Sequence, residues 1–88
     1  MLFALICKDK PDHFETRKAN RDAHLAYAKE SGAVKFGGPL IEDGNMVGSL
    51  CILDVEDRAA AEAWAANDPY AKAGLFASTE INEWKHVL

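Results

Sequence analysis

The side chains best suited to acid–base chemistry are those of His24 and Asp68, which stand far apart in the sequence. An imidazole exchanges protons near neutral pH, and a carboxylate beside it can orient the ring. Each residue also has a purely structural interpretation. His24 can be a partly buried histidine with satisfied hydrogen bonds, and Asp68 can cap the turn that begins at Pro69. Capping and catalysis are compatible, so the sequence leaves both interpretations open.

Basic side chains crowd one half of the helix that contains His24. At about 100° per residue, Arg17, Arg21 and His24 fall on the half that should face the sheet. Arg17 and Arg21 are one turn apart, a like-charge contact that costs roughly a few tenths of a kcal/mol unless an anion or a carboxylate neutralises it. We expect the carboxylate of Asp68 to neutralise this positive charge and to pair with His24 in a polar pocket between the helices and the sheet. The alternative is that both arginines extend past the sheet edge.

Three further candidates lie within apolar strands: Ser49, Cys7 and Cys51. Ser49 points either to a cavity or to the uncovered face of the sheet, which is the commoner case. The apolar surroundings of Cys7 and Cys51 favour buried free thiols over a disulfide in a reducing compartment. Cys7 has no activating neighbour in the sequence, so it is a poor candidate nucleophile.

Motifs for a metal or a cofactor are absent. His13 and His24 are roughly 16 Å apart along a helix, so one metal ion cannot bind both. The chain has no Cys-x-x-Cys, His-Glu-x-x-His, P-loop, Gly-x-Gly-x-x-Gly or Gly-x-Ser-x-Gly sequence. The sequence therefore predicts no metal, nucleotide or flavin cofactor.

The elements that must position these residues follow the order β-α-β-β-α-β. The expected strands are Met1–Lys8, Val34–Ile41, Met46–Val55 and Thr79–Val87, and the expected helices are about His13–Ser31 and Arg58–Asn67. This order predicts an α+β, ferredoxin-like fold, with a four-stranded sheet and two helices on one face. One domain should cover residues 1–88.

Local signals set the expected boundaries. Asp12 stands three residues before Glu15, a spacing typical of a capping box, and Gly32 supplies the stop of the first helix. The first helix should bury Phe14 and Leu25 against the sheet. Pro39 places the second strand at a sheet edge, because proline has no N–H for the ladder. We also expect a tight turn at Glu42-Asp43-Gly44-Asn45, an N-cap at Asp57 and an inward side chain at Trp64.

Composition bounds the partners. The 88 residues carry 10 basic and 14 acidic side chains, a net charge of −4, which disfavours nucleic acid and anionic membranes. Hydrophobic residues make up 49% of the chain, but 15 of them are alanine, so the core is thin and a homodimer that covers the bare sheet face is expected. The sequence has no run of about 20 apolar residues and no basic leader, which predicts a cytoplasmic protein.

Short motifs along the chain resemble the YciI-like (YCII-related) family. They are Arg21-Asp22-Ala23-His24-Leu25, Gly38-Pro39, Gly48-Ser49, and Asp68-Pro69-Tyr70 with Gly74. The resemblance covers nearly the whole chain and implies a dimeric α+β barrel with a site around His24 and Asp68, with Arg21 and Ser49 in its pocket. One member of the family is a dehydrochlorinase of a chlorinated hydroxyhydroquinone, and the wider superfamily includes muconolactone isomerases and cofactor-free monooxygenases. The short Glu42–Asn45 turn replaces a longer loop of some members.

The leading hypothesis is a small cofactor-independent enzyme, of lyase or isomerase type, that transfers a proton on a small anionic or phenolic metabolite. His24 would be the acid or base and Asp68 its orienting carboxylate. The expected substrate-binding residues are Arg21 as the anion clamp, Ser49, Arg17 and Tyr70. The alternatives are a non-catalytic dimer that binds or senses a small ligand, and a structural domain that assembles with other proteins.

Overall fold

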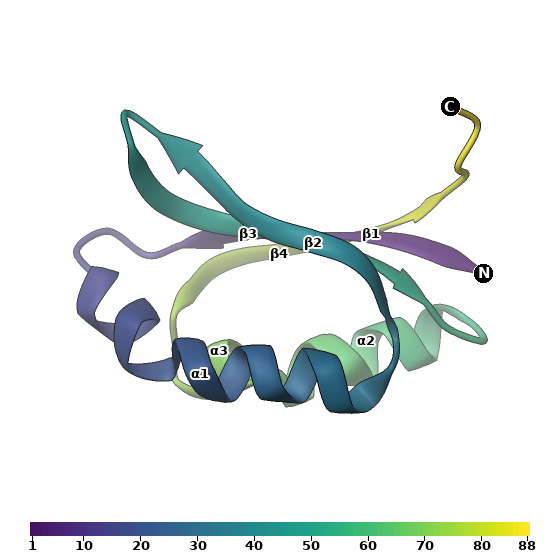
Figure 1. Cartoon of the computed structure of the whole chain (residues 1–88), viewed down its shortest axis with the longest axis horizontal. Helices are drawn as coiled ribbons and strands as arrows, with labels where there is room; N and C mark the ends of the chain where they lie inside the picture. The colour runs from purple at the N-terminus through teal and green to yellow at the C-terminus, as the bar shows by residue number, and fades with distance from the viewer.

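The computed structural model describes residues 1–88 as four strands and three helices (Figure 1). In chain order they are β1 (Leu2–Asp9), α1 (Phe14–Ser31), β2 (Val34–Glu42), β3 (Asn45–Asp54), α2 (Arg58–Asn67), α3 (Pro69–Lys72) and β4 (Phe76–Trp84). The predicted β-α-β-β-α-β order is confirmed, with the short α3 added after α2.

The strands form one antiparallel sheet in the order β2-β3-β1-β4, and all three helices lie on the same face of it (Figure 1). The ferredoxin-like α+β prediction is therefore confirmed. The edge position expected for the strand with Pro39 is also confirmed, since β2 pairs with β3 alone. No helix of this structure is both long enough and apolar enough to cross a membrane.

The core fills the space between the sheet and the helices. Alternate residues of β1 and β3 supply its sheet side, and Ala61 and Trp64 of α2 supply its helix side. The sheet residues in this core are Phe3, Leu5, Cys7, Cys51 and Leu53. Trp64 faces inward as predicted, and its indole nitrogen donates a hydrogen bond of 2.9 Å to Ser31 Oγ. Both cysteines are buried free thiols, as predicted.

The opposite face of the sheet carries no helix but has a small aromatic cover. Phe36 of β2, Ile52 of β3 and Ala4 of β1 are aligned across the sheet. Phe36 reaches over this row to Trp84 of β4, and the two rings meet edge to face with centroids 6.0 Å apart. Ile52 and Ala4 are buried, whereas Phe36 remains half exposed.

Several local signals act as the sequence indicates. Gly32 ends α1 in the left-handed conformation, with φ of 67°. Asp43 and Gly44 both have positive φ, which is the geometry of the tight hairpin turn between β2 and β3. Asp57 caps α2 by accepting a hydrogen bond from Ala60 N.

Three expectations about the chain are wrong. Asp12 is not the cap of α1, because it lies outside the helix with φ of 59° and His13 takes the N-cap position without a side-chain hydrogen bond. Phe14 and Leu25 are 56% and 49% exposed, since the inward half of α1 is given to Arg17 and His24 instead.

The last strand is also displaced from Thr79–Val87 to Phe76–Trp84. Its extent is set by its partner β1, because Asp9 pairs with Phe76 at one end and Leu2 pairs with Trp84 at the other. Backbone pairing decides the boundaries of an antiparallel strand, so β4 already includes Phe76, Ala77 and Ser78.

Candidate functional site

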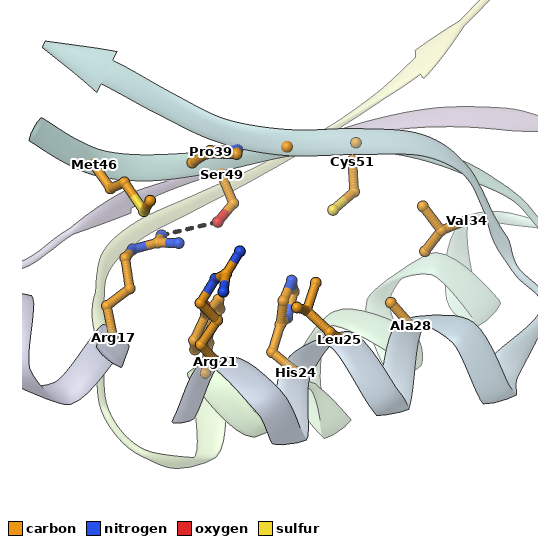
Figure 2. A pocket seen from close by; sticks show the side chains of 13 residues that line it. Arg17, Arg21, His24, Leu25, Ala28, Val34, Pro39, Met46, Ser49 and Cys51 are labelled. Carbon is orange, nitrogen blue, oxygen red and sulfur yellow. Dashed lines mark hydrogen bonds between the residues drawn. The ribbon is translucent and has the colours of Figure 1, made fainter. Parts of the chain in front are cut away.

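A cavity of about 180 Å³ lies between α1 and the β2–β3 half of the sheet (Figure 2). Its walls are partly polar and partly apolar. Its α1 side carries Arg17, Arg21, His24, Leu25 and Ala28, and its sheet side is formed by Val34, Gly37, Gly38 and Pro39 of β2 with Met46, Ser49 and Cys51 of β3. Tyr70 of α3 closes one part of the wall. The cavity therefore collects residues from three separate regions of the sequence.

His24 and Asp68 meet beside this cavity. His24 Nδ1 is 2.8 Å from Asp68 Oδ1, and both side chains are buried. The same Asp68 oxygen accepts the backbone N–H of Tyr70 at 3.0 Å, as the N-cap of α3. The carboxylate thus serves as a cap and as the partner of His24 at once.

This arrangement assigns the two ring nitrogens of His24. Asp68 Oδ1 already acts as an acceptor toward Tyr70 N–H, so the proton of its contact with His24 belongs to Nδ1. In the neutral ring, Nε2 then carries the lone pair. Nε2 has no hydrogen-bond partner in the chain, and His24 lines the cavity, so this nitrogen is available to a ligand.

Tyr70 supports the imidazole from its face. The rings of His24 and Tyr70 are stacked, with centroids 4.1 Å apart and an angle of 14° between their planes. Burial raises the pKa of the Tyr70 hydroxyl, although the nearby positive charges of Arg17 and Arg21 oppose this effect. Tyr70 therefore presents a neutral phenol at neutral pH.

Arg17 is paired with a residue that the sequence did not single out, Asp9. Its Nε and Nη2 atoms donate to the two carboxylate oxygens of Asp9, at 2.7 and 2.9 Å. Both side chains are buried, and the Arg17 guanidinium lies 4.7 Å from the centre of the Tyr70 ring. Burial opposes the charge of Arg17, but the hydrogen bond and the negative charge of Asp9 raise its pKa overall.

The expectation that Asp68 answers the charge of Arg17 is therefore wrong, and so is the alternative that both arginines extend past the sheet edge. Asp9 stands at the end of β1, just before the turn that leads into α1, and the chain returns Arg17 to it within one helical turn of the start of α1. The two arginines on one face of α1 indicated that a carboxylate should lie against them. The sequence could not show which carboxylate this would be.

Ser49 points into the cavity rather than to the uncovered face of the sheet. It is 5% exposed, and its Oγ accepts a hydrogen bond of 2.9 Å from Arg17 Nη2, the dashed line in Figure 2. The commoner expectation for a lone serine in such a strand is wrong here because Arg17 supplies a buried donor for it.

Arg21 differs from Arg17 in having no ion pair and no hydrogen bond in the chain. Its side chain is exposed yet lines the cavity, one helical turn from Arg17. An unpaired guanidinium at the border of a cavity can bind the negative charge of a ligand.

Neither cysteine is an activated nucleophile. Burial raises the pKa of the Cys51 thiol to about 11 and that of Cys7 to about 12. Cys51 thus lines the cavity as a neutral, weakly polar side chain at physiological pH. The structure also brings no three metal-binding side chains of the His, Cys, Asp or Glu types together in one place.

The fold and the cavity define a small ferredoxin-like α+β protein, with a histidine and an aspartate beside its internal cavity. Residues 1–85 match the YCII-related domain family. An uncharacterized protein of Haemophilus influenzae is 35% identical to the chain, and protein YciI of Escherichia coli is 34% identical, each over 99% of both sequences. The chain belongs to the YCII-related family, as its motifs indicate.

Solved structures agree with this assignment. The 5-chloro-2-hydroxyhydroquinone dehydrochlorinase TftG of Burkholderia phenoliruptrix AC1100, in complex with 2,5-dihydroxybenzoquinone, superposes with a TM-score of 0.90 at 37% identity and covers 99% of this chain and 96% of its own. An antibiotic biosynthesis monooxygenase superposes over the full length of both chains with a TM-score of 0.63 at 12% identity. The second similarity concerns the fold alone.

Proposed function

We propose that the protein is a cofactor-independent enzyme that transfers a proton on a small anionic or phenolic ring compound. The observation that carries this proposal is the free Nε2 of His24 at the cavity, with Nδ1 held by Asp68. His24 takes a proton from the substrate through Nε2, and Asp68 stabilises the imidazolium that results. Returning the proton to another atom gives an isomerase, and expelling a leaving group as an anion gives a lyase.

The size and the charge of the cavity support a ring-sized anion as substrate. An apolar cavity of about 150 Å³ holds one benzene molecule, and this cavity measures about 180 Å³. Arg21 contributes an unpaired positive charge, and Ser49, Arg17 and Tyr70 contribute polar or aromatic surface. The similarity to TftG, whose bound ligand is 2,5-dihydroxybenzoquinone, supports the same chemical class.

The test starts with a panel of substituted phenols, hydroquinones and quinones, screened for binding by thermal shift and for turnover by absorbance. We expect bound compounds to lose their effect in Arg21→Ala. We expect His24→Gln to abolish turnover and to retain binding, whereas His13→Gln, at the N-cap of α1 and outside the cavity, should retain both.

Two outcomes would favour the alternatives. Binding by the wild-type protein without turnover of any bound compound would favour a non-catalytic ligand-binding role. No binding across the panel would favour a domain that assembles with other proteins.

We also propose that the protein works as a homodimer. The support is the sheet face without helices, where Phe36 is half exposed and Leu2, Ile6 and Leu50 are only partly covered. A second copy placed on this face would remove apolar surface from water. A single domain over residues 1–88 and a cytoplasmic location stay predictions.

A further inference from the structure

The Ser49 hydroxyl has only one way to use its proton. A guanidinium donates hydrogen bonds and accepts none, so Ser49 Oγ is the acceptor in its 2.9 Å contact with Arg17 Nη2. The Ser49 proton has no acceptor within the chain, although Ser49 is buried and lines the cavity. This hydroxyl is therefore oriented as a donor toward whatever occupies the cavity.

Arg17 cannot leave this arrangement at low cost. Nη2 carries two hydrogens, and one bonds to Asp9 Oδ1 while the other bonds to Ser49 Oγ. Nε bonds to the second oxygen of Asp9, which fixes the plane of the guanidinium. The Arg17 and Asp9 side chains are only 4% and 8% exposed, so water does not compete for these bonds.

Ser49 and Arg21 both border the cavity as donors without acceptors in the chain, and His24 borders it with a free ring nitrogen (Figure 2). Two donors, one of them charged, suit an oxygen that carries negative charge and two or more lone pairs. An amino substituent suits this position less well, because its hydrogens would face the hydrogens of the Ser49 hydroxyl and the Arg21 guanidinium.

We propose that Asp9 and Arg17 are positioning residues that hold the Ser49 hydroxyl as a donor, and that Ser49 and Arg21 bind a phenolate or enolate oxygen of the substrate. The inference rests on the proposed function, because it names the substrate class of the same cavity. The substrate then enters with one hydroxyl already ionised, and His24 acts on a different atom of the ring. Ser49 and Arg21 touch the ligand, whereas Asp9 acts only through Arg17.

The test uses 4-nitrophenol, whose ionised form is yellow, and requires no turnover. We expect the wild-type protein to bind the phenolate and to lower the apparent pKa of the bound phenol. Ser49→Ala should weaken phenolate binding about tenfold or more, the usual effect of losing a hydrogen bond to a charged group. Ser49→Thr, which keeps the hydroxyl, should restore most of it.

A double-mutant cycle tests the role of Asp9. Asp9→Asn should weaken phenolate binding in the wild-type background and have no further effect in Ser49→Ala, because its influence passes through that hydroxyl. Asp22→Asn, a carboxylate of α1 exposed to solvent, is the matched control and should change nothing. If Asp9→Asn fails to fold, Arg17→Lys replaces it in the same cycle, since lysine lacks the planar bidentate group.

Three results would overturn the inference: binding of 4-nitrophenol only in its neutral form or not at all, full binding by Ser49→Ala, or equal losses from Asp9→Asn in both backgrounds. The proposed function is tested separately. His24→Gln should still bind the phenolate, so a loss of turnover in that variant does not bear on the Ser49 and Arg21 subsite.

Discussion

The imidazole of His24 lies almost parallel to the phenol ring of Tyr70, and both residues are held by the same oxygen of Asp68. Asp68 Oδ1 accepts from His24 Nδ1 and from the backbone N–H of Tyr70, so one oxygen holds the ring of His24 and the backbone of the residue stacked on it. Stacking then fixes the ring plane of His24, while the hydrogen bond fixes its rotation within that plane. The N-cap of the short helix α3 is thereby part of the candidate catalytic geometry.

Mutation of Asp68 should therefore separate its structural role from its catalytic role. Asp68→Asn keeps the accepting oxygen, so the free energy of unfolding should stay close to that of the wild type. Asp68→Ala removes the cap and should lower it by about 1 kcal/mol or more. Turnover should fall about 10²-fold or more in Asp68→Asn, because the imidazolium loses its negative partner.

Urea unfolding and turnover of a compound from the ligand panel measure the two effects. Wild-type turnover in Asp68→Asn would show that Asp68 is only a cap.

The same substitution should destabilise the protein strongly at Arg17 and hardly at all at Arg21. Arg17→Ala leaves the buried carboxylate of Asp9 without its partner, which should lower the free energy of unfolding by about 3–5 kcal/mol. Arg21→Ala removes a side chain with no partner in the chain, so its effect should stay within about 0.5 kcal/mol. Chemical denaturation of both variants measures the difference, and similar losses would contradict the assigned pairing.

Much of the fold could be predicted because its signals are local. Gly32 ends a helix by its own backbone preference, Asp43-Gly44 makes a tight turn, and Asp57 caps α2. Asp68 is equally readable as the cap of the turn that begins at Pro69, whereas its contact with His24, 44 residues away, depends on the fold. Signals of this kind do not depend on what the rest of the chain does.

The remaining features depend on contacts between distant segments. In the sequence, Asp9 looks like part of a turn and Ser49 like a lone polar residue of a strand. Only the fold brings both of them into hydrogen-bond contact with Arg17. Phe14 and Leu25 look like core residues, yet the buried positions of α1 go to charged side chains whose bonding partners lie elsewhere. Periodicity alone cannot show that a buried face is polar when the groups that satisfy it come from other strands.

Alkaline pH should destabilise the protein through its two thiols. Burial raises the pKa of Cys51 from 9.0 to about 11 and that of Cys7 from 9.0 to about 12. Above pH 9 the unfolded chain releases these protons while the native chain keeps them, so the free energy of unfolding falls as pH rises. The loss per thiol is on the order of 1 kcal/mol for each pH unit between its unfolded and its native pKa.

Urea titrations at several pH values above 9 measure this slope. Cys51→Ala should reduce the slope and leave the contribution of Cys7. An identical slope in that variant would mean that Cys51 does not contribute.

The sheet face without helices is the expected interface of a homodimer. Phe36 is 51% exposed on that face. Phe14 is 56% exposed on the helix side, so a substitution at Phe14 is a matched control for the same substitution at Phe36. A charge at Phe36 would be buried without a partner in a dimer that uses the sheet face, and this desolvation is costly. Sedimentation equilibrium at micromolar concentration should therefore find a dimer for the wild type and for Phe14→Asp, and a monomer or a weaker dimer for Phe36→Asp. A wild-type monomer would contradict the homodimer, and equal weakening by both substitutions would place the interface away from the sheet face.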